Sequence, residues 1–320
     1  MKNILVTGIG GGVGQGILRN IRSLQLDIAI TGTNVDAVSA GNYLCDMVYK
    51  VPYAFEASFI DTIKNIIAER KIDLVIPSTD YEAFYLAKFR GEFPCPVACS
   101  PEEVTGMCLD KYINYRQFSH YGIPFAQSIL PSEYKNEFEN YVVKPREGRG
   151  SRGIHLNVEE PSKFEDSYII QEFLDGPEIT TGVYITKEGK LHGSITLLRE
   201  LEAGATSKCE VVTIYDEGIT ALVSSILDHF KFLGSFNIQS RVTSKGIIPF
   251  EINCRISGTN SIRSQFGFKD VMYTLQEYLF HEQPEKITIQ QGAALRIMLD
   301  IIYPGATLAT IESSKNNYIF

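Results

Sequence analysis

The sequence predicts an α/β protein whose first third is a doubly wound parallel sheet. Short apolar runs at residues 4–6, 28–31 and 73–77 are typical of buried parallel strands. Residues 59–67 lie between two of these runs and place isoleucines at helical spacing on one face. A glycine-rich turn at 7–14 joins the first strand to the first helix, as in folds that bind dinucleotides.

The composition predicts a soluble globular protein. With 320 residues the chain is long enough for about two domains and a substantial core. The net charge of −8 argues against nucleic acid or an anionic membrane as a partner, because both require a basic surface. Six scattered cysteines show no zinc spacing, and neither a secretory signal nor a long apolar run is evident. We therefore expect a cytoplasmic protein with reduced thiols.

The glycine-rich turn has two interpretations. A helix N-terminus at such a turn can hold a phosphate, and Asp36 beyond the second strand could bind the ribose of NAD. Glycines are equally needed where a helix packs tightly against a strand. The sequence predicts the doubly wound fold more directly than it predicts the cofactor.

Two acidic residues follow the strand at 73–77. Asp80 and Glu82 stand at its carboxyl end, where ligands bind in open α/β sheets. They could bind a substrate amine or cation, or cap the next helix, and we favour capping. Residues 100–103 combine the spacing of a capping box with a proline, which predicts another helix start and a domain boundary near residue 105.

The middle of the chain contains residues of the kinds that bind nucleotides: lysines, a glycine-rich loop and an acidic residue. Asp110 and Lys111 open a helical stretch, and a strand over 141–145 contains Lys144. The loop that follows, 146–153, holds three glycines, three arginines and a serine, so it could close over phosphates or be a solvated turn. It lacks the ending of a P-loop.

A further strand is predicted over 168–174. Backbone groups after such a strand can read the edge of an adenine. Glu178 follows shortly and could accept hydrogen bonds from ribose hydroxyls.

A polar-faced hairpin over 235–253 is the strongest candidate for a metal site. Because strand side chains alternate between faces, Glu251 and Asn253 share one face, and Asn237 and Gln239 share a face on the partner strand. Carboxylate and carboxamide oxygens suit magnesium beside phosphates, and Arg255 could meet a phosphate oxygen. Read alone, the hairpin could equally present its polar face to solvent.

Taken in order, these pieces resemble the ATP-grasp superfamily, and most of all one synthetase unit of the carbamoyl-phosphate synthase large subunit and the stand-alone proteins like it. The resemblance covers about residues 1–270. The matching stretches are LVTGIGGGVGQ, LVIPSTDYE, the Asp110-Lys111 pair, VVKPREGRGSRGI, QEFLDGPEIT, AGATSK at 203–208, NIQ at 237–239 and FEINCRISG.

The resemblance implies a Rossmann-like pre-ATP-grasp domain over residues 1–105. It implies an ATP-grasp small subdomain with the phosphate loop over 106–180, and a large subdomain with the metal site and a C-terminal segment over 181–320. The implied activity is that of an ATP-dependent ligase, which activates a carboxylate as an acyl phosphate and joins it to an amine. The alternatives are a non-catalytic ATP- or NAD-binding regulatory module, or the synthetase subunit of a partner amidotransferase that supplies ammonia. A homodimer is also compatible.

The same resemblance implies residue roles. The cofactors are ATP and magnesium, expected as two ions. The implied nucleotide-binding residues are Lys111, Lys144, Gly148, Gly150, Ser151, Gly153, the hinge Glu172, Phe173 and Leu174, and Glu178 for the ribose. The implied metal ligands are Gln239, Glu251 and Asn253, and the implied catalytic residues are Lys144 and Arg255, with Arg199 and Lys208 on a loop that approaches the phosphate or the acceptor.

Some features depart from the family or match nothing in it. Cys254 stands where proline is common, and the 320 residues hold no second synthetase half and no glutaminase domain, which puts carbamoyl phosphate synthesis itself in doubt. For the acceptor we single out Ser257, Thr259 and Arg263, and Arg263 could clamp a carboxylate or be a surface charge. Residues 284–320 match nothing, although 293–303 reads as a strand.

Overall fold

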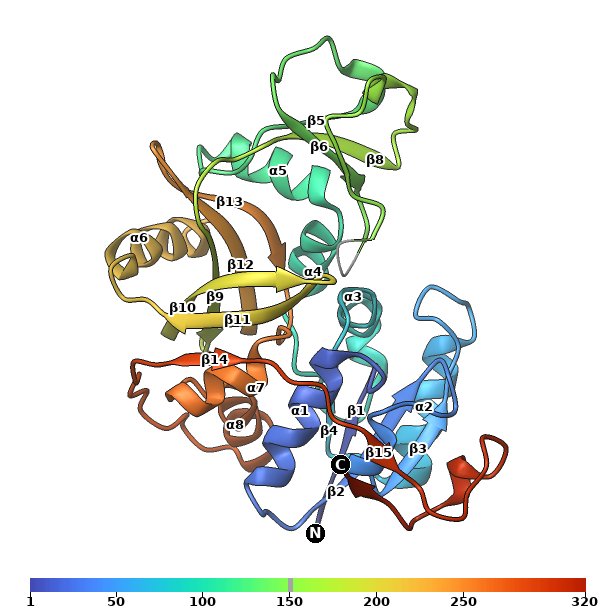
Figure 1. The fold of residues 1–320 in the computed structure, drawn as a ribbon. Coiled ribbons are helices and arrows are strands. Elements are labelled where there is room, and N and C mark those ends of the chain that lie inside the picture. The colour runs from blue at the N-terminus through green and yellow to red at the C-terminus, as the bar shows by residue number, and fades with distance from the viewer. Residues whose placement is uncertain (149–151) are drawn as a thin grey trace.

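The computed structural model describes residues 1–148 and 152–320. In Figure 1 a parallel sheet formed by the N-terminal part lies at the bottom, a large antiparallel sheet in the middle, and a small antiparallel sheet at the top. This arrangement confirms the predicted combination of an α/β domain with a two-part α+β portion.

The N-terminal sheet has the strand order β3-β2-β1-β4, and all its neighbouring strands are parallel. Leu5 and Val75 pack with α2 and α3 on one face, whereas Ile4 and Ile76 pack with α1 on the other, so the sheet is doubly wound. The elements are β1 (Lys2–Val6), α1 (Gly12–Ser23), β2 (Ile28–Asn34), β3 (Met47–Lys50), α2 (Phe59–Arg70), β4 (Leu74–Ile76) and α3 (Asp80–Lys88).

Close packing accounts for the glycines of the first turn. A Cβ atom on Gly14 would lie 2.6 Å from the carbonyl oxygen of Gly8 and 2.8 Å from the Cα of Ile9. A Cβ atom on Gly41, in a neighbouring loop, would lie 2.2 Å from the carbonyl oxygen of Ile9. Real Cβ atoms do not approach backbone so closely, so these positions need glycine whether or not a ligand binds.

Two helix starts near the domain junction differ from the prediction. The capping box forms at Thr79, whose hydroxyl accepts from the backbone N–H of Glu82 and donates to its carboxylate. Thr79 is therefore the residue whose side chain caps α3, where capping by Asp80 and Glu82 was expected. No capping box forms at residues 100–103, because Ser100 Oγ instead exchanges two hydrogen bonds with the backbone of Leu233.

Helices α4 (Glu102–Leu109) and α5 (Lys111–His120) join the two halves of the molecule, and α4 lies beside α3 in Figure 1. Val104 and Met107 of α4 belong to the core of the large sheet, so the boundary expected at residue 105 falls inside a helix of that core. Asp110 caps α5 by accepting from the backbone N–H groups of Tyr112 and Ile113.

The small sheet has the order β5-β8-β6-β7, and its pairs are antiparallel. The strand predicted over 168–174 ends earlier, at Glu172, because the next N–H, that of Phe173, bonds to the carbonyl of Asn140 outside the sheet. The strands are β5 (Ser128–Ile129), β6 (Tyr141–Pro145), β7 (His155–Leu156) and β8 (Tyr168–Glu172).

The large sheet has the order β13-β12-β9-β10-β11-β14 and is antiparallel throughout. Helices α4, α5 and α6 pack on one face, and α8 covers part of the other. The elements are β9 (Glu178–Ile185), β10 (Leu191–Glu202), β11 (Ala205–Val211), α6 (Asp216–Leu227), β12 (Gly234–Thr243), β13 (Gly246–Asn253), α7 (Asn260–Arg263), α8 (Asp270–Leu275) and β14 (Ala293–Leu295).

The C-terminal tail links the large sheet back to the N-terminal domain. The single strand predicted over 293–303 is wrong: β14 adds to the edge of the large sheet, and β15 (Ile301–Ile302) pairs with β16 (Tyr318–Ile319). Figure 1 shows this tail in red, crossing from β14 to the N-terminal sheet. Among the residues that the structure describes, no helix has the length and apolar character needed to cross a membrane.

Candidate active site

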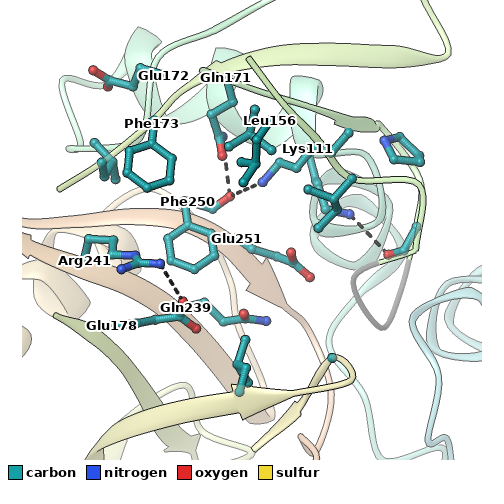
Figure 2. Close-up of a pocket in the computed structure, with 18 of the residues that line it drawn as sticks. Lys111, Leu156, Gln171, Glu172, Phe173, Glu178, Gln239, Arg241, Phe250 and Glu251 are labelled. Atoms are coloured by element: carbon teal, nitrogen blue, oxygen red, sulfur yellow. Dashed lines mark hydrogen bonds and ion pairs between the residues drawn. The ribbon is translucent and has the colours of Figure 1, made fainter. Parts of the chain in front are cut away.

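A pocket of about 340 Å³ lies between the small and the large sheets. Figure 2 shows Phe173 and Phe250 on the same side of the pocket, with Glu251 pointing away from the two rings. The lining residues come from α5, both sheets and the loops between them: Lys111, Val142, Lys144, Pro145, Gly148, Arg152, Ile154, Leu156, Gln171, Glu172, Phe173, Leu174, Glu178, Arg199, Leu201, Gly204, Gln239, Arg241, Phe250 and Glu251.

Many of the residues predicted for the nucleotide meet in this pocket. All three hinge residues line it, and Lys111, Lys144, Gly148 and Glu178 do so as well. A Cβ atom on Gly153 would touch the ring of Pro145, a pocket residue, at 3.2 Å. Gly150 and Ser151 lie outside the described residues.

The hinge offers one backbone donor. The N–H of Glu172 bonds to the carbonyl of Gln127, and the N–H of Phe173 bonds to the carbonyl of Asn140. The N–H of Leu174 has no such partner among the residues that the structure describes. Leu174 is therefore the hinge residue whose donor is available to the edge of a base.

Two lysines are enclosed in the pocket wall. Lys144 is 6% exposed and Lys111 is 7% exposed. Lys144 Nζ donates to the carbonyl of Phe250 at 3.2 Å, and Lys111 Nζ donates to the carbonyl of Gly148 at 3.2 Å. The pKa of Lys144 is lowered to about 7, mainly by burial and also by the charge of Lys111, although the nearby carboxylates Glu251 and Glu178 oppose this. An enclosed ammonium without a carboxylate partner is suited to an anionic ligand.

The predicted metal residues lie together because the β12–β13 register shifts between Gln239 and Ser240. Gln239 stands opposite Glu251, and Asn237 stands opposite Asn253. Gln239 Nε2 donates to Asn253 Oδ1 at 3.0 Å, and Asn253 Nδ2 donates to Glu251 Oε1 at 3.0 Å. The three predicted ligands thus form one hydrogen-bonded row.

The side chains of this row offer oxygen atoms of the kind that a hard cation such as magnesium binds. Burial alone would raise the pKa of Glu251, but the charges of Lys111 and Lys144 outweigh it and lower the pKa below its usual value, so the carboxylate stays ionised. One carboxylate and two carboxamides supply oxygen ligands. Within the described residues, no three His, Cys, Asp or Glu side chains gather as a metal cluster, so a cation here would complete its shell with phosphate oxygens and water.

Glu178 is held by two arginines. Its Oε1 accepts from Arg199 Nη2 at 2.6 Å, and its Oε2 accepts from Arg241 Nη2 at 3.2 Å. Arg199 Nη2 also donates to Gln239 Oε1 at 2.5 Å. Arg199, predicted on a loop near the phosphate or acceptor, therefore connects the predicted ribose residue to the predicted metal row.

Lys208 does not share this position. Its side chain is 62% exposed and pairs with Glu200 at 3.1 Å across the β10–β11 hairpin. It does not line the pocket. In this structure, Lys208 reaches neither the lysines nor the metal row.

Arg255 lies at the seam with the N-terminal domain. Its Nη2 and Nε donate to Asp80 Oδ2 at 2.8 and 3.2 Å. Its charge contributes to the low pKa of Glu251, which places it beside the metal row. Asp80, expected to cap α3, is instead the partner of the predicted γ-phosphate residue.

The three acceptor candidates lie in a closed network. Arg263 is fully buried, is ion-paired to Asp270, and donates from Nη1 to Ser257 Oγ at 2.8 Å. Ser257 Oγ and Thr259 Oγ1 share a hydrogen bond at 3.2 Å. Arg263 is therefore not a surface charge, and it has no exposed surface here for a substrate carboxylate.

Several pocket residues were not predicted. Arg241 could have been found from strand alternation, because it lies two residues after Gln239 on the same face of β12. Phe250 does not follow from that rule, because it adjoins Glu251 and both line the pocket where the β12–β13 register shifts. Arg146 lies outside the pocket lining and pairs with the helix-capping Asp110 at 2.6 Å, a contact for which the sequence carries no local signal.

Two family models match the chain. An ATP-grasp domain model matches residues 108–259, and a model described as the PylC-like, N-terminal domain matches residues 4–97. No curated protein matches the chain. The stretch matched by the first model contains Gln239, Glu251 and Asn253 together with Lys111 and Lys144. The stretch matched by the second contains the doubly wound sheet.

Solved structures share the architecture at low sequence identity. N5-carboxyaminoimidazole synthetase from Staphylococcus aureus, complexed with ADP, has a TM-score of 0.76 at 12% identity over 93% of this chain and 82% of its own. A carboxyaminoimidazole ribonucleotide synthase from Aspergillus clavatus, complexed with ATP, has 0.70 at 16% over 92% and 81%. Phosphoribosylglycinamide synthetase from Anaerococcus prevotii has 0.68 at 16% over 96% and 85%. These likenesses concern the fold, and the matching model shows that residues 108–259 of this chain are an ATP-grasp domain.

Proposed function

We propose that this protein is an ATP-dependent ligase. It activates a carboxylate or carbamate-like substrate as an acyl phosphate and then joins it to an amine, with release of ADP and phosphate. The observation that carries the proposal is the enclosure of Lys111 and Lys144 beside the ionised Glu251 at one end of the pocket. Such a site gives an anionic phosphate chain cationic partners and leaves a carboxylate for its metal ion.

The other end of the pocket suits a nucleoside. The rings of Phe173 and Phe250 supply apolar walls, and the free N–H of Leu174 supplies a donor for the edge of a base. Glu178 keeps acceptor capacity on Oε2, since Arg241 takes only one hydrogen bond there. A ribose hydroxyl is the ligand group that we assign to this position.

Catalysis in this proposal is mainly positioning and charge neutralisation. The substrate carboxylate attacks the γ-phosphate in line, and negative charge spreads over the phosphoryl oxygens. Lys144 neutralises this charge when protonated, and Arg255 does so from the side of the N-terminal domain. Both side chains are largely buried, which strengthens their effect on the phosphate.

Magnesium would be held by Glu251, Asn253 and Gln239, and it would neutralise charge on the phosphate oxygens. Gln239 and Asn253 would turn their carboxamide oxygens away from their present donors toward the cation. Arg199 would then lose its bond to Gln239 and keep its two bonds to Glu178. Removal of magnesium with a chelator should abolish turnover.

The similar structures support this class of activity over an NAD-binding module. Those named above are synthetases, two of them crystallised with ADP or ATP. The resemblance to a carbamoyl-phosphate synthase unit stays a prediction. The nature of the carboxylate and of the amine must come from assay.

The test is ADP release with ATP and magnesium over a panel of small carboxylates, including bicarbonate, and amines, including the common amino acids. Glu251→Ala and Arg255→Ala should lower turnover at least about a hundredfold. The matched control is Lys163→Ala, which removes a cation that is 71% exposed and outside the pocket. If both site variants turned over ATP like the control, the assignment would be wrong.

Two further arms separate the alternatives. Thermal stabilisation by NAD but not by ATP and magnesium would refute the ligase. Turnover with ammonium but with no free amine would indicate an amidotransferase partner, and sedimentation of the purified chain tests the homodimer.

A further inference from the structure

The pair between Arg255 and Asp80 joins residues that are 175 positions apart in the chain. Arg255 follows β13 of the large sheet, whereas Asp80 is the first residue of α3 in the N-terminal domain. The two side chains are 12% and 16% exposed. Both arginine nitrogens donate to the same oxygen, Oδ2 of Asp80.

The other oxygen of this carboxylate is unused. Asp80 Oδ1 is buried and accepts no hydrogen bond from the residues that the structure describes. A buried acceptor without a partner costs about 1–3 kcal/mol, and native proteins rarely leave one unfilled. An ionised carboxylate with a vacant oxygen offers its strongest binding to a cationic donor such as an ammonium group.

The pair stands between the phosphate end of the pocket and the edge of the N-terminal sheet. On one side, Arg255 acts on Glu251, which lines the pocket. On the other, Asp80 begins just beyond the carboxyl end of β4, the edge at which open α/β sheets bind ligands. Ile256, next to Arg255, packs in one core with Ile4 of the N-terminal sheet, so the seam is fixed here.

We propose that Asp80 binds the ammonium group of the acceptor, an inference that rests on the proposed ligase function. In the empty site Asp80 shares its charge with Arg255. When a nucleotide is bound, its γ-phosphate draws Arg255 toward the pocket, and Asp80 is left with both oxygens for the acceptor. The acceptor is thereby a positively charged primary amine, held on the side of the γ-phosphate that faces the N-terminal domain. Before its nitrogen attacks the acyl phosphate, the ammonium gives one proton to the Asp80 carboxylate, and the C–N bond then forms as phosphate leaves.

Asp80 could instead be only a tether between the two domains. A tether would change stability and turnover with all nucleophiles alike. A binding residue for ammonium would change the KM of charged amines and leave an uncharged nucleophile unaffected. The charge of the nucleophile therefore separates the two roles.

Hydroxylamine supplies the uncharged probe. It is largely neutral at pH 7.5, and it traps acyl phosphates as hydroxamates, which are measured directly. Wild-type protein, Asp80→Asn and the control Asp61→Asn are compared with hydroxylamine and with a panel of simple alkylamines and common amino acids. Each amine is scored both as an acceptor and as an inhibitor of the hydroxylamine reaction. Asp61 is a matched control, because it is an acidic residue in the first turn of the neighbouring α2, 80% exposed and 3.7 Å from Lys64.

The expected result is specific to charge. Asp80→Asn should raise the KM or inhibition constant of charged amines about ten- to a hundredfold, and hydroxamate formation with hydroxylamine should change far less than this. Asp61→Asn should match wild type. If Asp80→Asn failed to fold, Asp80→Glu, which displaces the oxygens by one carbon, should give the same rise in KM.

Equal losses with hydroxylamine and with amines would overturn the proposal, and so would a wild type that neither uses nor is inhibited by any charged amine. If the wild type formed no hydroxamate with any carboxylate, the ligase function itself would fail. The two failures are therefore distinguishable.

Discussion

Lys144 should take up a proton when the protein binds ATP. It is buried in the pocket wall, and within residues 1–148 and 152–320 its ammonium donates a hydrogen bond to one group, the carbonyl oxygen of Phe250. Burial lowers the pKa of Lys144 from its ordinary 10.5 to about 7. A phosphate chain beside it would favour the charged form and raise this pKa again. Nucleotide binding and protonation of Lys144 are then linked.

The size of the effect follows from the pKa. With a pKa of about 7, only about a tenth of the Lys144 side chains are charged at pH 8. If the phosphates raise the pKa above about 9, binding at pH 8 takes up about 0.8 to 0.9 proton, and binding at pH 6 takes up about 0.1. Above pH 7 the affinity for ATP should therefore fall by up to about tenfold per pH unit.

Calorimetry at saturating magnesium measures the uptake. The binding enthalpy is determined in two buffers that differ in their enthalpy of ionisation, at pH 6 and at pH 8. Lys144→Met, which keeps the length of the chain but carries no charge, should lose the uptake at pH 8, while the exposed control Lys163→Met should keep it. An uptake in the wild type below about 0.3 proton at pH 8, or an equal uptake in Lys144→Met, would refute the reasoning.

Three further predictions concern stability and reactivity. Glu178→Gln removes the carboxylate that pairs with Arg199 and Arg241, and it should lower the free energy of unfolding by about 2–3 kcal/mol. Urea denaturation measures this change, and an unchanged midpoint of the urea transition would contradict the importance of the pair. Gly14→Ala should lower the free energy of unfolding by about 2–4 kcal/mol, because its Cβ would lie too close to the backbone of Gly8 and Ile9. Gly12→Ala should leave the free energy of unfolding unchanged, because its Cβ would meet a side-chain atom of Arg296 at 3.8 Å. Equal effects of the two substitutions would refute the packing argument. All six thiols are buried, so iodoacetamide at pH 8 should alkylate the folded protein more than about tenfold more slowly than the urea-unfolded protein; similar rates would show that some thiols are exposed.

Local sequence rules predicted which polar side chains share a face within each strand of the β12–β13 hairpin, because side chains alternate with period 2. They did not predict the pairing across the hairpin. Counting back from the turn would set Gln239 opposite Phe250, but the register shifts between Gln239 and Ser240, and Glu251 stands opposite Gln239 instead. No local pattern in the sequence indicated this shift.

The partners of the charged residues could not be predicted in the same way. Residue types showed that Arg255 and Arg199 are cations, but not which carboxylates they meet. Arg255 meets Asp80 across the domain seam, and Arg199 meets Glu178 across the β9–β10 pair. Such contacts depend on how distant elements pack, which no local pattern encodes.

Tertiary contacts also overrode a local signal. Ser100 has the spacing of a capping box, yet its hydroxyl bonds to the backbone N–H and carbonyl of Leu233. These backbone groups need hydrogen-bond partners where the chain packs, and water can serve the exposed helix end. The box forms at Thr79 and Glu82 instead. Both sites carry a correct motif, and only packing distinguishes them.

The two cations of the phosphate end are restrained in different ways before a nucleotide arrives. Lys144 is held near the midpoint of its titration by burial, whereas Arg255 keeps its charge and is shared with Asp80. A phosphate chain would change both at once, because it favours the charged form of Lys144 and competes for Arg255. Only the second change frees a carboxylate on the side of the N-terminal domain. The charges of the site therefore favour binding of the nucleotide before the amine, since Arg255 holds Oδ2 of the amine's proposed partner, Asp80, until it turns to the phosphate.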